Sequence, residues 1–186
     1  MERSPLLVDL REIIRRSEEL SREFMSAVSG SHRRMVAAQL LNMALAAQFV
    51  CFLQMRRQAL MATIDGPSTL VQHLESFAAE DLEHTDRIAT RIHQLSGTPQ
   101  FGADWMVSPR TTRRQPLARM VHENAQAKLL AAGSLRGIAD KFDGDDSISH
   151  HLLSDIHASV EKQVLRMEAI VRQLSGPQGT TLAENC

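Results

Sequence analysis

The sequence predicts an all-α protein built on a long four-helix bundle, and three observations lead to this fold class. The chain has 186 residues, of which 43% are hydrophobic and 23% charged, so it can bury a core as a single domain. Aromatic residues make up only 4% and Tyr is absent, whereas strands favour aromatic and β-branched residues. Finally, turn-forming residues separate five long stretches that show helical periodicity.

The turn-forming residues fall at six places and set the expected helix limits. They are Pro5, residues 29–31, residues 65–68, the stretch 97–116, residues 143–146 and Gly176-Pro177. The helices are therefore expected at residues 5–28, 31–63, 68–95, 116–141 and 146–174. The first is amphipathic and the shortest. We expect an N-terminal accessory helix over residues 1–30, a four-helix bundle over 31–174 and a flexible C-terminal tail over 175–186.

The second stretch contains an uncharged run from Met35 to Met55. At about 1.5 Å per residue the run is long enough to cross the apolar core of a bilayer. It carries four amide side chains and many alanines, and the chain offers no second span, so we expect no membrane insertion. A helix that is apolar nearly all round is otherwise covered by its own bundle and by a neighbouring subunit. The run therefore predicts a homo-oligomer, either a dimer or a larger shell.

The lengths of the connections predict the topology. The short turns at residues 65–66 and 143–144 fold a helix back on its predecessor, which gives two antiparallel hairpins. The connection from Gly97 to Gln115 is much longer and, when extended, could span about 60 Å. Two antiparallel hairpins joined by a long crossover that runs end to end describe the ferritin-like topology, here with an extra N-terminal helix.

Charge and cysteine content limit the partners and the compartment. The net charge is −1, so no overall field draws the chain onto nucleic acid or an anionic membrane. Four arginines give the crossover a local basic patch near Trp105, but we expect a solvated surface there and no DNA binding: Arg110, Arg113, Arg114 and Arg119. The two cysteines, Cys51 and Cys186, form no disulfide framework. With no secretory pattern at the start, we expect a cytoplasmic protein.

Residues 80–87 (EDLEHTDR) of the third stretch could carry chemistry. Asp81 and Glu80 precede His84 by three and four positions, so in a helix their side chains share one face with the imidazole. Carboxylate and imidazole together suit a metal ion. The same pattern is also typical of a solvated charged face.

The segment from Glu80 to Gln100 resembles the second bundle helix and following loop of bacterioferritins. Those proteins have a carboxylate-x-x-His, followed by Asp and a basic residue, and end in Leu-x-Gly-x-Pro, as residues 95–99 do here. Residues 66–67, 152–156, 160–162 and 167–169 are similar to Dps-type mini-ferritins. The resemblance covers residues 31–174 and implies a diiron ferroxidase site in the bundle.

In bacterioferritins each hairpin supplies a Glu from its first helix and a Glu-x-x-His from its second. The resemblance implies metal ligands at Asp81 and His84 on the third stretch and at Glu123 on the fourth. The first-helix Glu corresponds to Gln48 in one alignment and to Ala44 in another.

The second Glu-x-x-His falls on Val160 and Gln163, so the implied site is incomplete and relies on Gln48 and Gln163 as neutral substitutes. Three outcomes stay open: a weak ferroxidase, a single metal held by Asp81, His84 and Glu123, or a hydrogen-bond network without metal. Leu82 stands where haem-binding members have Met, so we expect no haem.

The resemblance implies iron binding, storage or protection from oxidative stress, with iron or another divalent metal as the bound ion. The alternative is a catalytically silent ferritin-like protein that acts through oligomer assembly or partner binding. Three histidines near the start of the last stretch are expected at a solvated helix end rather than at a metal site: His150, His151 and His157.

Overall fold

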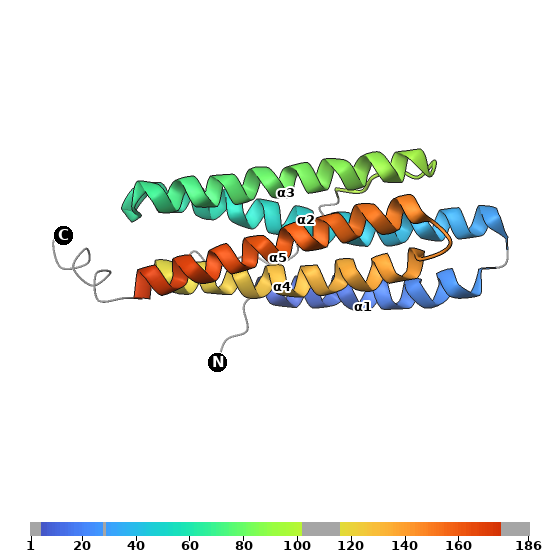
Figure 1. The fold of residues 1–186 in the computed structure, drawn as a ribbon, viewed down its shortest axis with the longest axis horizontal. Helices are drawn as coiled ribbons and strands as arrows, with labels where there is room; N and C mark the ends of the chain where they lie inside the picture. Colours follow the sequence, from blue (N-terminus) through green and yellow to red (C-terminus); the bar gives the residue numbers. More distant parts are fainter. Residues whose placement is uncertain (1–4, 28, 102–115, 176–186) are drawn as a thin grey trace.

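The computed structural model describes residues 5–27, 29–101 and 116–175, which form five helices and, within these ranges, no strand (Figure 1). The helices are α1 (Pro5–Ser26), α2 (Gly30–Asp65), α3 (Ser68–Gln94), α4 (Leu117–Phe142) and α5 (Ser147–Ser175). Each end lies within two residues of the limit expected from the sequence. The predicted all-α fold class is confirmed.

Two antiparallel hairpins form the bundle. α2 and α3 turn at Gly66, whose N–H donates to the Ala62 carbonyl at 2.7 Å, and α4 and α5 turn at residues 143–146. α3 ends at the opposite end of the bundle from the start of α4, as the predicted crossover requires (Figure 1). Residues 102–115 of that crossover and the tail from residue 176 lie outside the described residues.

Asn42 of α2 fixes the start of the crossover. Its side-chain Nδ2 donates to the Thr98 carbonyl at 3.1 Å, and its Oδ1 accepts from the Gln100 N–H at 2.8 Å. Gly97 lies so close to α2 that a Cβ there would come within 2.7 Å of the Ala38 Cβ. The Leu-x-Gly-x-Pro sequence therefore has a packing role, because only glycine allows this approach.

α2 is the central core helix. By length and composition it could cross a membrane, but 78% of its most apolar 18-residue window is buried inside the bundle. It contacts α1, α3 and α4. Its apolar character is therefore explained by burial within one chain.

α1 supplies part of the cover that the sequence led us to expect from a neighbouring subunit. Leu10, Ile13 and Phe24 of α1 belong to the same core cluster as the first half of α2. The Phe24 ring meets the Phe142 ring of α4 edge to face, with centroids 5.4 Å apart. α1 thus lies along α2 and α4 as part of the packed core (Figure 1).

The core is divided in two along the bundle. One apolar cluster contains the α1 contacts, and the second lies toward the α2–α3 turn and includes Met55, Phe77 and Met167. Between them, α3, α4 and α5 contribute buried polar residues: Asp81, Thr85, Asn124, Lys128 and Gln163. This polar layer is the candidate site.

Candidate functional site

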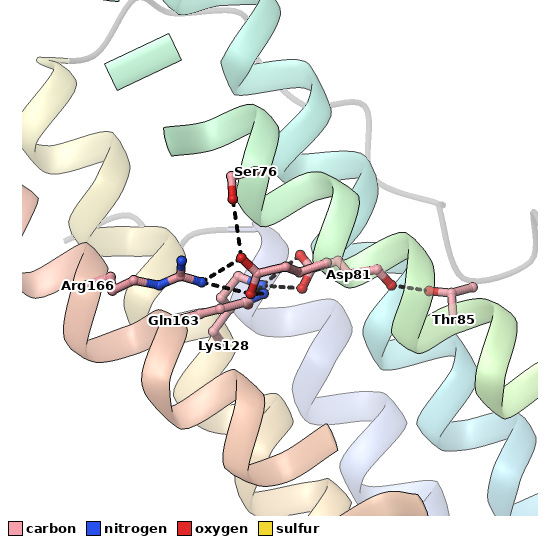
Figure 2. Close-up of polar contacts among 7 residues, drawn as sticks. Ser76, Asp81, Thr85, Lys128, Gln163 and Arg166 are labelled. Atoms are coloured by element: carbon pink, nitrogen blue, oxygen red, sulfur yellow. Dashed lines mark hydrogen bonds and ion pairs between the residues drawn. The ribbon is translucent and has the colours of Figure 1, made fainter. Parts of the chain in front are cut away.

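A buried ion pair joins α3 to α4 at the centre of the polar layer (Figure 2). The ammonium Nζ of Lys128 donates to both carboxylate oxygens of Asp81, at 2.5 and 2.6 Å. The two side chains are 1% and 0% exposed. Short, charge-assisted bonds to both oxygens fix the ammonium against the carboxylate.

Gln163 of α5 connects this pair to the surface. Its Oε1 accepts from Lys128 Nζ at 2.6 Å, and its Nε2 donates to Glu80 Oε2 at 2.9 Å. Arg166 Nη2 donates to both oxygens of Glu80, at 2.6 and 2.7 Å, and stacks its guanidinium 4.7 Å from the Phe77 ring centroid. The network therefore runs from a buried pair to a half-exposed pair, with one carboxylate for each cation (Figure 2).

The acids of this network titrate in different directions. Burial raises the pKa of Asp81, and the Lys128 ammonium opposes that rise. For Glu80, burial acts in the same sense, but the hydrogen bonds from Arg166 and Gln163 outweigh it and lower the pKa. A carboxylate held between a guanidinium and an amide N–H is stabilised in its charged form.

Gln48 of α2 and His84 of α3 lie equally far along the chain from Gly66, where the α2–α3 hairpin turns. Gln48 is fully buried, and neither atom of its amide has a hydrogen-bond partner among the described residues. The same holds for Nδ1 of His84, which is 4% exposed. Burial, followed by the positive charges of Lys128 and Arg87, lowers the pKa of His84 to about 4. The ring is therefore neutral at physiological pH.

Glu123 of α4 is half-buried, and in the part of the chain that the structure describes no group of three His, Cys, Asp or Glu side chains unites it with Asp81 and His84. Its carboxylate accepts from Arg119 Nε at 3.0 Å, one helical turn earlier on α4. Val160 is buried in the apolar cluster. The structure thus brings Asp81 and Gln163 together through Lys128, buries His84 and Gln48, and pairs Glu123 with Arg119.

Lys128 is the residue that sequence reasoning missed. Helical spacing held the signal, because Lys128 falls on the same stripe of α4 as the buried residues Val121, Ala125 and Leu135. A lysine on an apolar stripe predicts either a solvated helix edge or a buried ion pair. Only the packing of α3 and α5 against that stripe shows that Lys128 forms a buried ion pair.

The residues of the centre do not fit a diiron site. Two ferric ions need several carboxylates, whereas Asp81 is the one fully buried carboxylate among the described residues, and both its oxygens are bound to an ammonium. Cys51 offers no anionic ligand, because burial raises the pKa of its thiol to about 12. Within the described ranges no group of three or more His, Cys, Asp or Glu side chains could hold a metal ion.

The family model described as ferritin, ferritin-like domain, matches residues 38–176. This chain belongs to the ferritin family. The match covers all four bundle helices of this ferritin-like protein, apart from the first turns of α2, and leaves α1 outside. A search of curated proteins gives no match to the sequence.

Proposed function

We propose that this ferritin-like protein is a non-oxidising subunit, which acts in iron storage or oxidative-stress protection through assembly rather than through a ferroxidase centre of its own. The observation that supports the proposal is the Lys128–Asp81 ion pair at the middle of the bundle. The ammonium places a fixed positive charge among Asp81, His84 and Gln163, the residues nearest to the family's ligand positions.

The charge of Lys128 opposes metal binding at the bundle centre. A divalent ion at Asp81 would have to displace Lys128, and an unpaired buried ammonium costs several kcal/mol. The remaining candidates, His84 and Gln48, are neutral and offer no compensating negative charge. Lys128 therefore supplies, from within the chain, the positive charge that a bound cation would supply to Asp81.

Iron oxidation kinetics test this proposal. Fe(II) is added anaerobically to the full chain, air is admitted, and the absorption of oxo-bridged Fe(III) is followed. We expect the rate to equal that of protein-free buffer, both in the parent and in Asp81→Asn. Rapid oxidation by the parent that Asp81→Asn or His84→Ala abolishes would overturn the proposal.

The finer assignment to the bacterioferritin or Dps neighbourhood, in the cytoplasm, is part of the same proposal. It is supported by the Asp81-x-x-His84 spacing and by Cys51, which is a free, buried thiol. For DNA binding, Arg119 is committed to Glu123, whereas the other three arginines of the basic patch lie outside the described residues. We propose no nucleic-acid partner.

A further inference from the structure

Two histidines of α5 reach across to backbone carbonyls of α4. His157 Nδ1 lies 3.1 Å from the Ala132 oxygen, and His150 Nδ1 lies 3.0 Å from the Ala139 oxygen. A carbonyl oxygen only accepts, so Nδ1 carries the proton in both rings. In the neutral ring Nε2 then keeps its lone pair and is free to act as a ligand. The two histidines are therefore held in the same tautomer by the same kind of contact.

His157 differs from His150 in having a carboxylate in front of its second nitrogen. Nε2 of His157 lies 3.5 Å from Oε2 of Glu161, one helical turn further along α5. A direct bond from a charged ring to a carboxylate would be about 2.7 to 2.9 Å long. Two ligands of a tetrahedral ion with bonds of about 2.1 Å stand about 3.4 Å apart. The observed separation of 3.5 Å matches two ligands of one metal ion better than a direct hydrogen bond.

We propose that His157 and Glu161 form a binding site for a divalent first-row metal ion such as Zn²⁺, outside the bundle centre. Mixed imidazole and carboxylate ligands suit this class of ion. The bond from Nδ1 to the Ala132 carbonyl is the outer contact that commonly orients a metal-binding histidine. The His157 side chain is 17% exposed and that of Glu161 56%, so water completes the coordination from the solvent side.

This site is independent of the proposed function, because it uses neither Asp81 nor Lys128. His150 provides a matched control. Replacing either histidine by Ala removes the same bond to an α4 carbonyl, so the two variants should lose similar stability. Only His157→Ala also removes a nitrogen that faces a carboxylate.

Zn²⁺ titration of the full chain, by equilibrium dialysis and calorimetry near pH 7.5, tests the site. We expect His157→Ala to bind about one Zn²⁺ fewer per chain than the parent, and Glu161→Gln to weaken that site by at least about tenfold, because loss of even an outer contact to a metal ligand costs about tenfold or more. His150→Ala should bind like the parent. Zn²⁺ should also shift the ¹⁵N resonance of His157 Nε2 in the parent.

Two results would overturn the assignment. One is a His157→Ala variant that binds as much Zn²⁺ as the parent while the His157 resonance in the parent does not respond to Zn²⁺. The other is an equal loss of Zn²⁺ in His150→Ala and His157→Ala, which would show a general effect of helix packing. Glu161→Gln distinguishes a local metal site from an effect of helix packing. The Glu161 side chain is exposed, so this change should weaken Zn²⁺ binding without disturbing the core.

Discussion

Lys128 determines the charge of the bundle centre. Its ammonium neutralises Asp81 inside the protein, and Gln163 satisfies a further donor and passes the network on to Glu80. A buried ion pair usually adds little net stability compared with apolar residues of the same size. What the pair does provide is alignment, because one ammonium has partners on α3 and α5 at once.

Removing the lysine alone should therefore be far more damaging than removing both charges. Lys128→Ala leaves the Asp81 carboxylate buried and unpaired, and we expect a loss of about 3 to 5 kcal/mol. For a chain of this length that corresponds to a fall of about 10 °C in Tm. Calorimetry and urea unfolding measure both. The double variant Asp81→Leu with Lys128→Met should recover most of the loss, and equal damage in the single and double variants would argue against the ion pair.

His84 should make stability depend on pH. Its pKa is about 4 in the folded chain and about 6.5 when unfolded, so between these values the unfolded state binds more protons. The His84 contribution is complete above pH 6.5 and is lost as pH falls toward 4, up to about 3 kcal/mol. Urea unfolding of His84→Gln across this range should show a flatter pH profile than the parent. His93→Gln, an exposed control on the same helix, should keep the parent's slope.

Among the helices, local sequence signals account for the ends but not for the packing of α1. Gly66-Pro67 and residues 143–146 stop helices whatever surrounds them, so the limits follow from the sequence. α1 has an amphipathic pattern that says only that one face is buried. That the face is covered by α2 and α4 of the same chain depends on distant contacts, such as Phe24 with Phe142, which no local pattern contains.

Local sequence signals likewise predict only part of the candidate site. The spacing of Asp81 and His84 predicts that they share one face of α3, and the resemblance assigns Gln163 of α5 to a ligand position. Lys128 could not be assigned, because a lysine side chain is long enough to reach solvent from the edge of an apolar stripe. Glu123, also on α4, matches the family's chemistry, but its carboxylate accepts from Arg119 one helical turn earlier, a contact that the family pattern does not contain.

If α1 is part of the core, shortening its contacts should destabilise the whole bundle. Phe24 is 1% exposed, and Phe24→Ala should cost about 3 to 5 kcal/mol through lost contacts and the cavity left behind. Its neighbour Met25 is 64% exposed, so Met25→Ala should change stability by less than about 0.5 kcal/mol. Urea unfolding compares the two. An α1 that is only an appendage would make both substitutions harmless.

Because α1 covers part of α2, it limits where a second subunit can bind. Apart from Gln39, residues 36–48 of α2 are buried within the chain, whereas its last turns expose three large apolar side chains close together: Leu60 (58%), Met61 (38%) and Ile64 (77%). Several such side chains close together on one helix are typical of a protein–protein contact. Homo-oligomers mostly form through closed symmetric contacts, in which the same patch meets itself.

We therefore expect the chain to form a dimer or larger particle through the last turns of α2. Size-exclusion chromatography with light scattering at micromolar concentration should show a mass at least twice 20.7 kDa. Leu60→Glu with Ile64→Glu should shift the particle toward monomer without unfolding it, because both side chains are exposed in the single chain. Leu165→Glu, equally exposed but on α5, should leave the mass unchanged. A parent that elutes as a 20.7 kDa monomer would rule out assembly, and an oligomer that only Leu165→Glu breaks would move the contact to α5.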